Sequence, residues 1–118
     1  MADHHNIDTF EDDRAKRRVF QEFEQAIWES NRAAITAAAG GITKEQVLRV
    51  AITVSRLRAR YLREVLKLSA DAGAESLDPT AVLDLRQMRE AYEEALNAFG
   101  ALRHALERGY IDFAHSKR

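Results

Sequence analysis

Hydrophobic positions recur at spacings of three and four residues along most of this chain, which is the period of an amphipathic helix. Isoleucine and valine are scattered singly through charged segments, so no stretch alternates as a half-buried strand would. The pattern predicts an all-α protein. It is most regular in the middle of the chain, where one heptad-like row contains Val47, Val50, Val54, Leu57, Tyr61, Val65 and Leu68.

The first helix is expected over residues 9–39. Asp8 or Thr9 can cap its amino end, and Gly40–Gly41 provides a stop because glycine adopts the left-handed C-terminal conformation at little cost. One side of this helix carries an apolar stripe, which Trp28 and Ile35 widen and which the polar residue Asn31 interrupts. The stripe itself consists of Phe20, Phe23, Ile27, Ala34 and Ala38.

Local capping signals mark the two other helices. A helix over residues 43–71 opens with Thr43 and Gln46, the spacing of a capping box. A helix over residues 78–109 opens with Asp78 and Pro79 and stops at Gly109. The apolar row of this last helix contains Val82, Leu85, Met88, Tyr92, Ala95, Phe99, Leu102 and Leu106.

Both connections between these helices are short, so consecutive helices should run antiparallel. We therefore expect an up-down-up bundle of three long helices forming a single domain over residues 1–118. Residues 1–8 are expected to be flexible, and residues 110–118 to form a short tail. Three apolar residues in the tail, Tyr110, Ile111 and Phe113, suggest that it folds back over the bundle end.

The middle helix carries more apolar surface than one stripe requires. Its second row contains Leu48, Ala51, Ala59, Leu62 and Leu66, and the two rows together cover roughly 200° of the helix. Two neighbours within a bundle explain part of this width. The remainder predicts helix packing between chains, most simply in a homodimer, with an interface that includes Arg58, Leu62, Leu66 and Trp28.

Composition narrows the class of protein. The 118 residues are 46% hydrophobic and 31% charged, with one proline and no cysteine. The absence of cysteine excludes disulfide scaffolds and fits a reducing compartment. Neither a membrane-length apolar run nor a signal-peptide pattern is present, so a cytoplasmic location is expected.

The net charge of −1 argues against bulk attraction to nucleic acid, but the charges are unevenly distributed. Residues 42–73 hold seven basic and three acidic groups, whereas the segments on either side are acidic. A regular basic stripe could follow phosphates, and it could equally be a solvated helix face. On a helical wheel this stripe lies opposite the main apolar row, and it contains Arg49, Arg56, Arg60, Arg63 and Lys67.

Arg58 points away from the other arginines, toward Ala51, Leu62 and Val65. It could anchor an interface or extend along apolar surface to reach water. A third hypothesis makes Arg58 the binding group for a small anionic substrate. That hypothesis requires a concave pocket with Arg58 buried in it.

No catalytic triad, nucleotide-binding loop or metal-ligand spacing is found, so we expect no enzyme activity, no cofactor and no metal. Residues 37–47 resemble the turn of a helix-turn-helix motif, although a plain helical hairpin explains them equally well. The leading hypothesis is a helical protein that acts by protein–protein interaction as an adaptor, regulator or structural accessory. The alternative is a nucleic-acid-binding regulator that uses the basic stripe.

Overall fold

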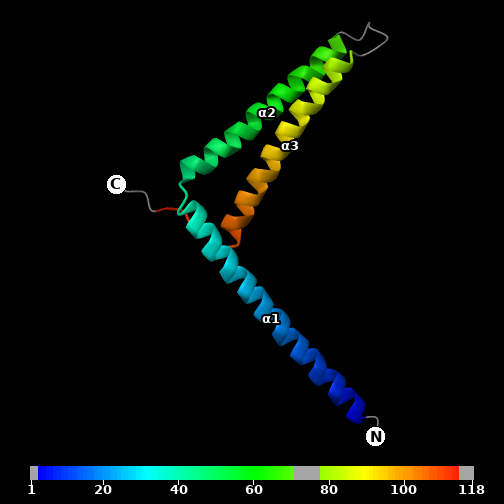
Figure 1. Cartoon of the computed structure of the whole chain (residues 1–118), viewed down its shortest axis with the longest axis vertical. Helices are drawn as coiled ribbons and strands as arrows, with labels where there is room; N and C mark the ends of the chain where they lie inside the picture. The colour runs from blue at the N-terminus through cyan, green and yellow to red at the C-terminus, as the bar shows by residue number, and fades with distance from the viewer. Residues whose placement is uncertain (1–2, 71–77, 115–118) are drawn as a thin grey trace. The chain divides into compact units, whose positions relative to one another are not determined.

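A computed structural model describes residues 3–70 and 78–114, and helices dominate this part of the chain. They are α1 (Asp3–Ala39), α2 (Lys44–Ala70) and α3 (Pro79–Glu107), shown in Figure 1. The predicted all-α class and the three helices are confirmed. No helix within the described ranges combines the length and apolar character needed to span a bilayer. The predicted connection around residues 71–77 lies outside the described residues.

The chain divides into two compact units, residues 1–40 and residues 41–118. The first unit consists, in its described part, of α1. This helix begins at Asp3, earlier than the predicted start at Asp8 or Thr9. No glycine or proline separates Asp3 from Thr9, so extending the helix through these residues costs little once it has nucleated.

The carboxyl end of α1 is the predicted glycine stop. Gly40 has a φ of +65°, in the left-handed region, and its N–H donates to the carbonyl of Thr36 at 2.8 Å. The predicted apolar stripe also forms, but its large side chains stay in contact with solvent. Phe20, Phe23 and Ile27 are 61%, 56% and 58% exposed, which differs from the core position expected for them.

The second unit is a helical hairpin in which α2 and α3 run antiparallel and pack along one another (Figure 1). The side chains between the two helices form a seam that consists largely of the predicted apolar rows of α2 and α3. Val54 is buried at the centre of this seam and Ala105 at its base. Predicted Val65 and Val82 are 37% and 44% exposed, so they lie at the edge of the seam. The half-buried seam positions are Val47, Val50, Leu57, Tyr61, Glu64, Leu68, Leu85, Met88, Tyr92, Ala95, Phe99, Leu102 and Leu106.

Both helices of the hairpin begin with the predicted caps. Thr43 Oγ1 accepts from the N–H of Gln46 at 3.1 Å, and Gln46 Oε1 accepts from the N–H of Thr43 at 2.8 Å. At the start of α3, Asp78 Oδ1 accepts from the N–H of Thr80 at 3.0 Å. These bonds satisfy amide groups that the helix itself leaves unpaired.

The carboxyl end of α3 is closed by a Schellman motif. Gly109 has a φ of +75°, its N–H donates to the carbonyl of Leu106 at 3.2 Å, and the Tyr110 N–H donates to that of Ala105 at 2.9 Å. Tyr110 and Ala105 are both buried, as the apolar contact that accompanies this motif requires. The chain thus reverses direction after α3, and the tail leads back toward the hairpin base.

The tail folds back as predicted and pairs with the segment that leads into α2. The Ile42 N–H donates to the carbonyl of Asp112 at 3.2 Å, and the Ala114 N–H donates to that of Ile42 at 2.7 Å. Ile42 and Ile111 are buried, the latter only 3% exposed. A Cβ added to Gly41 would lie 3.1 Å from the Cβ of Ala114, so glycine permits this close approach. The hairpin base is therefore the best-buried part of the second unit.

Candidate interaction surface

Arg58 connects the two helices of the hairpin near its middle. Its Nε donates to the hydroxyl of Tyr92 at 3.0 Å, and its guanidinium carbon lies 5.2 Å from the centroid of that ring. The Tyr92 ring stacks on Tyr61 with centroids 6.4 Å apart and an interplanar angle of 21°. Arg58 is thus held over aromatic surface at the seam edge, an arrangement that combines a hydrogen bond with a cation–π contact.

The Arg58 side chain is exposed. The guanidinium group therefore contacts Tyr92 on a side chain that is open to solvent, which fits either an interface anchor or a side chain that reaches water along apolar surface. The small-anion hypothesis required Arg58 to be buried in a concave pocket. That condition is not met, so the hypothesis in this form is wrong.

The five cations of the basic stripe are all exposed, but their surroundings differ. Lys67 Nζ lies 3.3 Å and Arg63 Nε 3.9 Å from the same carboxylate oxygen of Glu64. Such exposed pairs contribute little to stability. Arg49, Arg56 and Arg60 form no ion pair with any residue that the structure describes.

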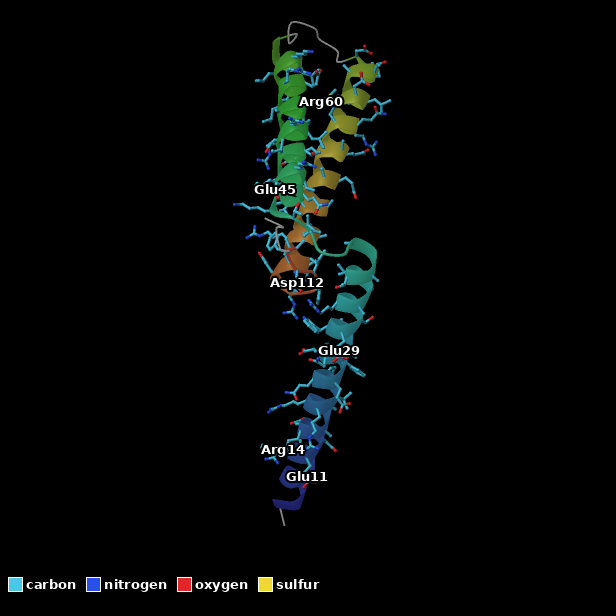
Figure 2. The ribbon with its side chains drawn as sticks, turned by 90° about the vertical axis from the view of Figure 1, so that its left-hand side faces the viewer. Glu11, Arg14, Glu29, Glu45, Arg60 and Asp112 are labelled. Carbon is cyan, nitrogen blue, oxygen red and sulfur yellow. The ribbon has the colours of Figure 1, made fainter. Side chains whose placement is uncertain are left out.

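The helical wheel predicted that Arg60 lies opposite the main apolar row of α2. This prediction is wrong, because Arg60 lies beside a cleft between α2 and α3. Arg60, labelled on α2 in Figure 2, borders this cleft of about 260 Å³, which Leu57 of α2 and Asp84 of α3 also line. The reason is angular. Arg60 is displaced by about 60° from Leu57 on the helix, since three residues at 100° each fall 60° short of a full turn. It therefore belongs to one edge of the hairpin rather than to its back.

The outward face of α2 carries a second heptad row. Leu62 and Leu66, predicted as interface residues, are 51% and 68% exposed. Ile52, which is not part of the predicted second row, is 48% exposed. With Ile52 included, the row advances by alternating steps of four and three residues. That spacing could have identified it. We call this row the outward seam: Leu48, Ile52, Ser55, Ala59, Leu62 and Leu66.

Arginines flank the outward seam on both sides. Arg49, Arg56 and Arg63 each follow a seam residue directly, and Arg58 precedes Ala59 on the other side. No acidic residue occupies a flanking position between Leu48 and Leu66. The face is thus an apolar strip with uniformly basic borders.

Trp28, the remaining predicted interface residue, lies on α1. It is half-buried, and the guanidinium carbon of Arg32 lies 5.8 Å from the centroid of its ring. Phe20, Phe23 and Ile27 of the same helix are considerably more exposed. The strongest apolar surface of α1 therefore lies nearer its amino end than Trp28.

Three of the acidic residues of α3, Glu90, Glu93 and Glu107, pair with arginines one helical turn away. Arg86 and Glu90 approach to 2.9 Å, and Arg103 and Glu107 to 2.8 Å. Among the described residues, no group of three or more histidines or carboxylates is arranged to hold a metal ion. These side chains are typical of a solvated helix surface stabilised by local pairs.

Among the described residues, one unit is thus a helical hairpin with an exposed apolar face on α2, and the other is a long helix with an exposed apolar stripe. No protein-family model, curated protein or solved structure matches the chain. Its function therefore has to be inferred from its own surfaces.

Proposed function

We propose that this protein acts by protein–protein interaction rather than by catalysis, as an adaptor, regulator or structural accessory in the cytoplasm. The observation that supports it is the outward seam of α2, whose four large apolar side chains are each about half exposed or more. Exposed apolar strips of this length are typical of surfaces that bind another helix. Leu62 and Leu66 are the central contacts in this proposal.

The arginine borders specify the partner. If a second copy of α2 docked on the outward seam, arginine would face arginine in either orientation, because all four flanking charges are positive. A helix with an apolar stripe and acidic borders would instead form opposite-charge pairs along the whole strip. The proposed partner of this surface is therefore an amphipathic helix flanked by Glu or Asp.

A designed helical peptide can test this surface on the full chain. We expect a peptide with an apolar heptad row and glutamate borders to bind at least tenfold more tightly than its lysine-bordered counterpart, because several charge pairs change sign. Leu66→Glu should weaken binding by about tenfold or more, since burying a leucine contributes about 1.5–3 kcal/mol. Fluorescence anisotropy measures both effects.

Leu83→Glu provides the matched control, since Leu83 is 51% exposed on α3 and outside the outward seam. It should leave peptide binding unchanged. Equal binding of the two peptides, or equal loss in the Leu66 and Leu83 variants, would rule out the outward seam as a docking surface.

A second candidate function is nucleic-acid binding through the basic stripe. It is favoured by the exposed guanidinium groups of Arg49, Arg56 and Arg60, which pair with no described carboxylate. If these groups contact phosphates, the double variant Arg56→Glu, Arg60→Glu should reduce the slope of log K against log salt by about two on duplex DNA. Arg103→Glu on α3 is the control. An electrophoretic shift assay that shows no complex at about 50 mM salt would exclude this candidate.

A further inference from the structure

The exposed apolar stripe of α1 requires a partner of its own. Val19 is 44% exposed, and the three larger side chains of the stripe are more than half exposed. Val19, Phe20 and Phe23 also line a shallow groove that Asp12 and Lys16 border. A long helix that buries little apolar surface gains little tertiary stabilisation, so a covered stripe would be much more stable.

The charges beside this stripe form two opposite blocks. Residues 14–18 hold four cations and no acid: Arg14, Lys16, Arg17 and Arg18. Residues 22–29 hold three acids and no cation: Glu22, Glu24 and Glu29. Arg17 and Glu24 form no ion pair with any described residue. Between the two blocks lie the uncharged residues Val19, Phe20 and Gln21.

These blocks distinguish two orientations of a pair of α1 helices. In a parallel pair the basic block would face the basic block of the other chain, which is repulsive. In an antiparallel pair with its two-fold axis between residues 21 and 22, each basic block faces an acidic block. The antiparallel arrangement is closed, because the same surface serves both copies.

The helical register agrees with the charge blocks. Phe20 and Phe23 have the three-residue separation of facing core positions, so each would oppose the other residue in the second copy. Arg17 and Glu24 are seven residues apart and thus lie on the same side of the stripe. A two-fold axis perpendicular to the helices brings the same side of both helices together. Arg17 of each copy would therefore lie beside Glu24 of the other copy, which gives two such pairs in the dimer.

We propose that α1 is the self-association surface of this protein, forming an antiparallel homodimer centred on Phe20 and Phe23 with reciprocal Arg17–Glu24 ion pairs. This inference rests on the homodimer expected from the sequence and assigns it to α1 rather than to the outward seam of α2. The outward seam then remains available for a different helix.

Charge exchange on the full chain tests the register. Arg17→Glu or Glu24→Arg alone places like charges together at two symmetric sites, so each should raise the dimer Kd by about tenfold. The double variant Arg17→Glu, Glu24→Arg should restore the original Kd. Sedimentation equilibrium over a concentration series measures all three constants. Arg18→Glu, with the same charge change on the opposite face of α1, is the control and should have a smaller effect.

Cross-linking tests the orientation independently, since the natural chain has no cysteine. Val19→Cys and Ala26→Cys are made in separate chains, mixed and treated with a short thiol–thiol cross-linker. Because each chain has one cysteine, every cross-linked product joins two chains. The antiparallel dimer should give mainly the mixed product, whereas a parallel dimer would give mainly the two symmetric products.

The outcomes separate this inference from the proposed docking surface. A dimer whose Kd is unaffected by the single charge changes, or symmetric cross-links, would overturn the α1 register. A strict monomer would overturn self-association altogether. Neither result affects binding of an acidic-bordered peptide to the outward seam, which is measured separately.

Discussion

Replacing Ile111 with alanine is expected to lower the free energy of unfolding of the hairpin unit by about 2–4 kcal/mol. Ile111 is only 3% exposed and belongs to the tail that pairs with Ile42 at the hairpin base. Truncating a buried isoleucine removes transfer free energy and leaves a cavity. Ile111 is one of five buried hydrophobic residues in the part of the hairpin unit that the structure describes, so the loss is a large share of its buried core.

Phe113→Ala is the matched control for this change. Phe113 lies two residues further along the same tail, yet it is 55% exposed. We expect its truncation to alter stability by less than about 1 kcal/mol, as is usual for surface positions. Urea denaturation followed by circular dichroism gives both values. Similar losses for the two variants would mean that the tail does not contribute a buried anchor at Ile111.

The same substitution, glycine to alanine, should have opposite effects at two positions of the hairpin. At Gly109, where φ is +75°, alanine should destabilise the protein by about 1–2 kcal/mol because its Cβ clashes in the left-handed conformation. At Gly100, inside α3, a Cβ would meet nothing within 4 Å. Alanine there should stabilise the protein by about 0.5–1 kcal/mol, since it restricts the unfolded chain and favours helix.

Thermal unfolding of the two variants checks this pair. For a unit of this size, a change of 1 kcal/mol shifts Tm by roughly 4–8 °C, so the two midpoints should move in opposite directions by a measurable amount. A Gly109→Ala variant as stable as the natural protein would show that the Schellman motif does not constrain the end of α3.

Most of what was predicted correctly depends on neighbours in the sequence. The capping box of Thr43 and Gln46, the Asp78 cap and the stop at Gly109 involve residues no more than a few positions apart. Their chemistry is local, so it can be inferred without knowing which helices pack together. The apolar rows of α2 and α3 follow for the same reason, because the spacing of side chains along a helix is a local property.

The surroundings of Arg58 could not be predicted in this way. Its partner Tyr92 is 34 residues distant along the chain, and the contact depends on the alignment of α2 against α3. Wheel angles place Arg58 on the correct side of α2 but do not say which side chain of α3 is opposite. The cleft beside Arg60 depends on the same alignment, because Asp84 of α3 forms its other side.

The sequence by itself determined the all-α class, the helix ends and the apolar rows, because hydrogen bonding and side-chain periodicity within a helix are properties of nearby residues. Only the tertiary structure decided which rows are covered. It buries one face of α2 against α3 and leaves the outward seam exposed, and within its own unit the α1 stripe is exposed as well. Burial depends on which distant segments meet, and that information is distributed over the whole chain rather than held in any one helix.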